Sequence, residues 1–146
     1  MTPDNRQLLS AVLITRNAAS QLEDCIASLA FCDEILVVDS GSEDGTEAIA
    51  KRHGARVIQS NWRGFGPQKQ FAVDQASHDW VLCIDADERV SGRLQEGFRT
   101  VLAAVSPAPT SGAYRFARCN CFMGRYLKHG EGYPDWSLRL FDRRRA

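Results

Sequence analysis

The sequence predicts an α/β protein whose mostly parallel β-sheet is covered by helices. From residue 8 to residue 105, apolar runs of strand length alternate with segments whose apolar residues recur at helical spacing. Crossover helices of this kind join parallel strands. A shorter, strand-rich stretch follows, and it predicts a small antiparallel part near the C-terminal end.

The predicted strands of the parallel part are residues 8–15, 34–39, 55–59 and 80–85. Helices are predicted over residues 20–29, from Ser42 or Asp44 to Gly54, and over residues 68–76 and 91–105. Ser20 and Glu23 have the spacing of a capping box, and Gly54 suits a helix C-cap. Two more strands are predicted over residues 113–122 and 136–142, and residues 61–67 are expected to form a loop.

Composition narrows the classes of function. The chain of 146 residues is long enough for a single domain, residues 1–146, with its own core. Its 18 basic residues balance its 18 acidic ones, so nothing favours nucleic acid as a partner. The five cysteines are odd in number and lack a Cys-x-x-Cys pair, which predicts packing thiols in a reducing compartment. No apolar run is long enough to span a membrane and no signal peptide is evident, so we expect a cytoplasmic location.

Asp85 and Asp87 stand at the end of the apolar strand predicted over residues 80–85 and are the first candidate site. If this segment is extended, both carboxylates point to one side. Hard oxygen ligands of this kind suit Mg²⁺ or Mn²⁺, which leave coordination positions open for water and phosphates. The alternative is a solvated turn, and the pattern alone leaves the two interpretations about equal. Glu88 is either an outer partner of the site or solvated.

Other polar residues follow the remaining strands. Asp39 ends its strand, and its carboxylate either contacts a ligand or accepts hydrogen bonds from the next turn. Lys69 follows a glycine-rich loop and is either a phosphate-binding cation or a solvated side chain. Asp135, among aromatic residues, is either a general base or a turn residue. Ligands of parallel sheets bind outside the carboxyl ends of the strands, so we expect the ends at Thr15, Asp39 and Asp85 to share one edge.

Five stretches occur together and in order: AVLITRNAASQLEDCIASL, EILVVDSGSEDGT, GFGPQKQFA, WVLCIDADE and FMGRYLKHGEGYPDWSLRLF. With them the chain resembles family 2 glycosyltransferases of the GT-A (Rossmann-like) fold, over about residues 8–142. Within that family it is similar to bacterial glycosyltransferases of lipopolysaccharide core assembly. The pairing of VVDSGSEDGT with a later DAD is specific to the family, and the third and fifth stretches point to the subgroup.

The resemblance implies a role for each matching residue. Asp87 and Asp85 match the metal-binding D-x-D motif, with Asp87 the more direct ligand of Mg²⁺ or Mn²⁺. Asp135 matches the catalytic base, although Pro134 stands where the family often has Glu. The positions implied to contact the nucleotide are Thr15, Arg16, Asn17, Asp39, Lys69, Asp85 and Arg139.

The implied reaction is metal-dependent and inverting. A sugar passes from a nucleotide-diphosphate sugar, with UDP the expected nucleotide, to a glycan or lipid-linked saccharide such as the lipopolysaccharide core. Such enzymes continue beyond the point where this chain ends, so we expect the domain to be incomplete at its C-terminal side. The absent part is where a peripheral contact with the inner face of the cytoplasmic membrane is expected.

Two alternatives stay open. A sugar-nucleotide nucleotidyltransferase shares the sheet and the metal carboxylates, but it would need a glycine-rich basic loop after the first strand, where this chain has TRNAASQ. A non-catalytic fragment that binds nucleotide or carbohydrate would keep the fold without the transfer reaction.

Overall fold

A computed structural model describes residues 6–103, 113–118, 121–122, 125–126 and 135–144, with side chains described through residue 103 and from Arg139. Four helices and eight strands lie in this part of the chain. In order they are β1 (Leu9–Thr15), α1 (Ala19–Ala27), β2 (Glu34–Asp39), α2 (Thr46–Arg52), β3 (Arg56–Gln59), α3 (Phe65–Gln75), β4 (Trp80–Cys83), α4 (Gly92–Leu102), β5 (Ala113–Arg118), β6 (Cys121–Phe122), β7 (Arg125–Tyr126) and β8 (Asp135–Asp142).

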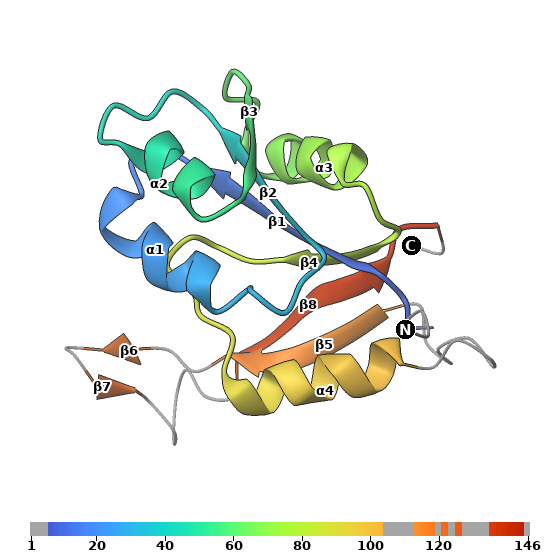
Figure 1. The fold of residues 1–146 in the computed structure, drawn as a ribbon. Coiled ribbons are helices and arrows are strands. Elements are labelled where there is room, and N and C mark those ends of the chain that lie inside the picture. Colours follow the sequence, from blue (N-terminus) through green and yellow to red (C-terminus); the bar gives the residue numbers. More distant parts are fainter. Residues whose placement is uncertain (1–5, 104–112, 119–120, 123–124, 127–134, 145–146) are drawn as a thin grey trace.

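Six strands form one sheet in the order β3-β2-β1-β4-β8-β5 (Figure 1). The four strands from β1 to β4 are parallel, whereas β8 runs antiparallel to both of its neighbours. The strands β6 and β7 form a separate two-stranded ribbon. The α/β class, the mostly parallel sheet and the small antiparallel part predicted from the sequence are therefore confirmed.

The helices pack on the sheet through buried residues, most of which are apolar. Leu22, Cys25 and Ile26 of α1 are buried with Phe98 of α4 and Ala50 of α2 in one core cluster. Ala72 and Val73 of α3 are buried in a second cluster with residues of β1, β2 and β4. The two clusters correspond to the two faces of the sheet, with α3 apart from the other helices in Figure 1. No helix in the described ranges is long and apolar enough to cross a membrane.

Three helix starts differ from the prediction, and α2 begins at Thr46 instead of Ser42 or Asp44. α1 begins at Ala19, its cap residue Ala18 makes no side-chain capping bond, and the predicted capping box at Ser20 is wrong. Side chains from the start of α2 and the loop before it bond to this end of α1 instead: Thr46 Oγ1 accepts from the Ala18 amide at 2.9 Å, and Asp44 Oδ2 accepts from the Ala19 amide at 3.0 Å. α3 begins at Phe65, within the predicted loop, because proline is tolerated in the first turn of a helix, where Pro67 lies.

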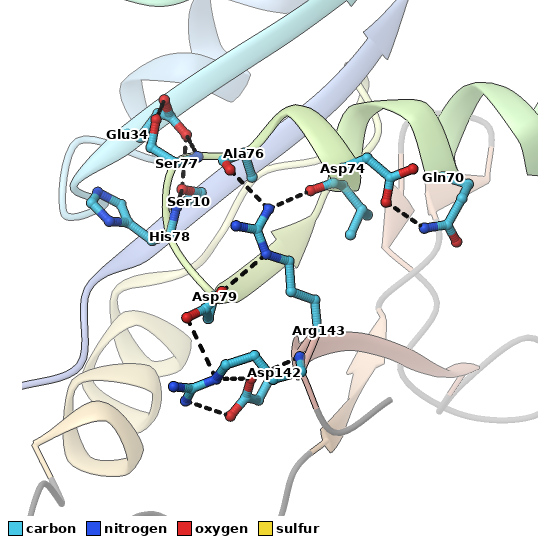
Figure 2. A network of polar contacts seen from close by, with 12 residues as sticks. Ser10, Glu34, Gln70, Asp74, Ala76, Ser77, His78, Asp79, Asp142 and Arg143 are labelled. Atoms are coloured by element: carbon cyan, nitrogen blue, oxygen red, sulfur yellow. Dashed lines mark hydrogen bonds and ion pairs between the residues drawn. The ribbon is translucent and has the colours of Figure 1, made fainter.

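A polar cluster fixes β8 against β4 at the end of the sheet opposite to the carboxyl ends of β1 and β4 (Figure 2). The Arg143 guanidinium donates to the carbonyls of Val73 and Ala76, at the end of α3, at 2.9 and 2.8 Å. It also donates to Asp79 Oδ1 at 3.1 Å, just before β4. Because Arg143 directly follows β8, these bonds help to set the register in which Leu82 lies opposite Leu140.

Candidate functional site

The carboxyl ends of the parallel strands lie at one edge of the sheet, as the sequence predicts. Thr15 is directly opposite Asp39 in the pairing of β1 with β2. The β4 strand ends at Cys83, opposite Val12, and Asp85 follows two residues later. Because β8 is antiparallel, its N-terminal end lies at this same edge. The loops that follow these strands are therefore close enough to build a single site.

The loops after β1 and β2 are tied to each other. The Asn17 side chain accepts from the Glu43 amide at 2.8 Å, and Ser42 Oγ accepts from the Asn17 amide at 2.7 Å. Asn17 has a φ of 52°, the one left-handed value found among the described non-glycine residues. Asparagine adopts this conformation more readily than most residues do. Asn17 thus joins two loops, while Arg16 beside it is exposed.

Asp39 is fully buried and its carboxylate accepts four hydrogen bonds. The donors are Thr15 Oγ1 at 2.7 Å, Ser42 Oγ at 2.6 Å, the Ser42 amide at 2.9 Å and the Gly41 amide at 3.1 Å. Burial alone would raise the pKa of Asp39, but the bonds from Ser42, Thr15 and Gly41 hold it below its ordinary value. Asp39 therefore shapes the loop after β2, and its implied contact with the nucleotide stays a prediction.

Asp85 and Asp87 lie in a tight turn and not in an extended segment. The Glu88 amide donates to the Asp85 carbonyl at 2.9 Å, which closes a turn over these four residues. The Glu88 side chain folds back and accepts from the Asp85 amide at 2.8 Å. The alternation that would place both carboxylates on one side of a strand therefore does not apply, and Glu88 acts on the turn itself.

Arg139 of β8 anchors this turn. Its guanidinium donates to Glu88 Oε1 at 2.8 Å and to the Cys83 carbonyl at 3.2 Å, and it is 3.5 Å from Asp85 Oδ2. The side chains of Arg139 and Glu88 are only 13% and 14% exposed, so solvent screens their attraction weakly. Burial alone would lower the pKa of Arg139, but Glu88 and Asp85 raise it above its ordinary value.

Lys69 of α3 also contacts this turn. Its ammonium is 3.6 Å from Asp85 Oδ1 and its side chain is 42% exposed. Asp85 thus lies between two cations, Lys69 of α3 and Arg139 of β8. Asp87 is exposed, and no described residue hydrogen-bonds or ion-pairs with its carboxylate.

The acidic side chains of this turn suit a divalent cation that takes its remaining ligands from a bound substrate. No three acidic, histidine or cysteine side chains of the described residues gather into a metal cluster. The turn offers the open carboxylate of Asp87 and the partly compensated one of Asp85. Mg²⁺ and Mn²⁺ sites in which substrate phosphates complete the shell typically use one or two carboxylates. The residues present therefore fit such an ion.

Two cavities adjoin this edge and share Ser40. One, of about 530 Å³, is lined by Asp39, Ser40, Gly41, Gln59, Ser60, Asn61, Arg63 and Phe71. The other, of about 310 Å³, is lined by Ile14, Thr15, Arg16, Ser40, Trp62 and Phe65. Both volumes fall within the range of small-molecule sites. The sequence motifs do not point to Trp62 and Phe65, although a tryptophan in the polar stretch NWRGFGP is a signal for a side chain that faces a ligand.

Asp135 begins β8, and its side chain lies outside the described part. The strand backbone places it four residues before Arg139, about 13 Å along the strand at 3.3 Å per residue. It therefore lies beyond the end of β4, at the edge that carries the other candidates. Residues 127–134, which contain Pro134, lie outside the described residues.

Comparison with known proteins agrees with this arrangement. Residues 10–100 match the model of glycosyl transferase family 2. Over 101 residues the chain is 45% identical to lipopolysaccharide core biosynthesis glycosyltransferase LpsC of Rhizobium meliloti (strain 1021), covering 66% of this chain and 37% of LpsC. The chain therefore spans little more than a third of that relative. The range matched by the family model includes the positions of Asp39, Lys69, Asp85 and Asp87, but neither Asp135 nor Arg139.

Solved structures show the same fold. Mannosyl-3-phosphoglycerate synthase from Rubrobacter xylanophilus superposes with a TM-score of 0.58 at 32% identity, covering 75% of this chain and 38% of that one. Glucosyl-3-phosphoglycerate synthase from Mycobacterium tuberculosis, in complex with Mn²⁺, UDP and glucosyl-3-phosphoglycerate, gives a TM-score of 0.53 at 25% identity, covering 70% and 40%.

We expect Asp39→Asn to destabilise the fold at neutral pH, because an amide cannot replace an ionised acceptor of four hydrogen bonds. The expected loss is about 1–3 kcal/mol in the free energy of unfolding. The lowered pKa of Asp39 means that its contribution is present above the unfolded pKa of about 3.9 and is lost as the pH falls through the folded value. Urea unfolding at neutral and acid pH measures this. A gap between wild type and variant that did not narrow in acid would contradict the assignment.

We expect Glu88→Ala to speed hydrogen exchange at the Asp85 amide, whose acceptor is the Glu88 carboxylate. Glu88→Gln keeps an acceptor oxygen and is expected to preserve most of the protection. Exchange at amides in the centre of β1 is the internal control, because these amides lie in strand pairs of the sheet. Equal exchange at Asp85 in Glu88→Ala and wild type would show that Glu88 does not hold the turn.

Proposed function

Because the chain belongs to glycosyl transferase family 2, we propose that it binds a nucleotide-diphosphate sugar at the carboxyl edge of its parallel strands and takes part in transferring that sugar. The observation that carries this proposal is the cluster of Lys69, Asp85 and Arg139 beside the open carboxylate of Asp87. Cations and a free carboxylate side by side suit a diphosphate together with its divalent metal.

The nucleotide and the acceptor follow from the similar proteins. A similar synthase from Mycobacterium tuberculosis has been solved with Mn²⁺ and UDP, which supports UDP as the donor nucleotide here. LpsC is named for lipopolysaccharide core biosynthesis, which supports a glycan or lipid-linked saccharide as the acceptor. The chain spans only part of these proteins, so acceptor and activity are proposed for the whole protein. A cytoplasmic location, at the inner face of the membrane, belongs to the same proposal.

In this proposal each part of the edge has its own task. Asp87, with Asp85 beside it, would hold Mg²⁺ or Mn²⁺, which supplies positive charge to the diphosphate leaving group. The residues proposed to hold the nucleotide are Thr15, Arg16, Asn17, Asp39, Lys69, Asp85 and Arg139. For Asp39 and Arg139, the described contacts support a role through loop shape, because both side chains are engaged within the protein.

The chemistry proposed is a single displacement with inversion. Asp135 accepts the proton of an acceptor hydroxyl, and the oxygen bonds to the anomeric carbon as the bond to the diphosphate breaks. The antiparallel direction of β8 supports this role, because it brings the start of that strand to the donor edge. A base in this position promotes attack without a covalent sugar–enzyme intermediate.

A binding fragment without transferase activity is the second candidate, because the chain covers 37% of LpsC. It would bind nucleotide through the same edge but would transfer nothing. Nucleotide binding and transfer therefore need to be measured separately.

We expect the chain to bind UDP in the presence of Mn²⁺, and Asp87→Asn to weaken that binding. We expect UDP affinity to fall by at least about 10- to 100-fold, because removing even an outer partner of a metal site has an effect of that size. Titration calorimetry with and without EDTA measures this. Asp74→Asn is the matched control, because Asp74 is an exposed carboxylate that bonds to Gln70 on α3. Unchanged UDP affinity after Asp87→Asn or EDTA would refute the metal role.

We expect Asp135→Asn to leave UDP affinity within about twofold and to lower sugar transfer by about 10²- to 10⁴-fold, the range of general base catalysis. The protein for this test carries whatever further residues transfer requires, and product formation from the UDP-sugar is the readout. Normal transfer in Asp135→Asn would exclude it as the base.

A further inference from the structure

We propose that Trp62 and Phe65 form a stacking wall for the nucleobase of the donor, in the cavity of about 310 Å³ at the ends of β1 and β2. This inference rests on the proposed function. It adds two base-binding residues to the set expected from the sequence motifs and commits the base to one of the two cavities.

The exposure of the two side chains is the first observation. Trp62 is 46% exposed and Phe65 is 72% exposed, and Leu8 is the remaining large apolar side chain with comparable exposure in the described ranges. Their rings meet edge to face, with centroids 4.9 Å apart and planes at 86°. A ligand that covers these two adjacent aromatic rings is favoured, because it removes apolar surface from water.

The rest of the cavity lining is mostly polar. Thr15, Arg16 and Ser40, at the ends of β1 and β2, line the cavity together with the apolar Ile14. A cavity lined by aromatic rings and by polar groups suits a planar ring with hydrogen-bonding edges. Nucleobases have this character, and stacking on aromatic side chains is a common way of holding them.

The position of the cavity favours the nucleobase of the donor, and not the acceptor, as the group that occupies it. Phe65 and Lys69 are four residues apart on α3, hence on one face and about 6 Å apart along the axis. Lys69 contacts Asp85, where the diphosphate is proposed to bind. A ribose can connect a base beside Phe65 to phosphates at this cluster. The acceptor must instead reach Asp135 on β8, which lies beyond β4 in the strand order.

The larger cavity is the rival site, and its lining argues against it. The Arg63 guanidinium covers the ring of Phe71, with 4.4 Å from its central carbon to the ring centroid. The aromatic face there is already occupied by a cation–π contact, whereas the rings of Trp62 and Phe65 are open. We therefore place the base against Trp62 and Phe65 and not against Phe71.

Two ligands separate base binding from phosphate binding: UDP with Mn²⁺, and pyrophosphate with Mn²⁺ as the probe that lacks a base. In titrations of the full chain, we expect the double variant Trp62→Ala and Phe65→Ala to lose about 5- to 150-fold in UDP affinity, the range that stacking contributes. Pyrophosphate affinity should stay within about twofold. Trp62→Phe should keep most of the UDP affinity, and Leu8→Ala is the matched control for loss of an exposed apolar side chain.

Tryptophan fluorescence of the unmodified chain gives a second measurement that needs no alanine variant. UDP should change the emission more than pyrophosphate does, and Trp62→Phe should remove that difference. Unchanged UDP affinity in the double variant, or equal losses for UDP and pyrophosphate, would overturn the inference. A loss of UDP affinity in Arg63→Ala with none in the double variant would move the base to the larger cavity. If the wild-type chain bound neither ligand, the proposed function would fail first and the inference with it.

Discussion

The carboxylate of Glu88 connects the two halves of the sheet at the candidate site. It accepts a hydrogen bond from the Asp85 amide and another from the Arg139 guanidinium. The first bond shapes the turn after β4, and the second ties that turn to the antiparallel strand β8. Because the side chains of Glu88 and Arg139 are largely buried, each charge depends on the other for compensation. The positions of Asp85 and Asp87 follow from this one bridge.

Charge compensation explains why acidic residues can gather at this edge. Asp85 lies between Lys69 and Arg139, and Asp39 receives four hydrogen bonds within its own loop. These carboxylates are stabilised before any ligand arrives. Asp87 differs because it is exposed and has no partner in the described ranges. The proposed diphosphate and its cation would therefore meet a site in which one acidic group is open and the others are held in place.

The strand order separates the tasks proposed for the site. The aromatic cavity lies at the ends of β1 and β2, the diphosphate cluster lies at the end of β4, and Asp135 begins β8. A donor lying across the edge would thus present its base on one side and its sugar toward β8. The network around Arg143 supports this order from the opposite end of the sheet, because it fixes β8 in register with β4 (Figure 2).

The sequence by itself determined the α/β class, the strand order along the chain and the edge where Thr15, Asp39 and Asp85 lie, because apolar periodicity and strand ends are local signals. It also singled out Lys69 and Arg139. Only the tertiary structure decided that Asp39 serves its own loop, that Glu88 closes the Asp85 turn, and that Asp44 and Thr46 cap α1. It also decided that Trp62 and Phe65 face a cavity. These outcomes depend on partners far apart in the chain, which neither propensity nor spacing can identify.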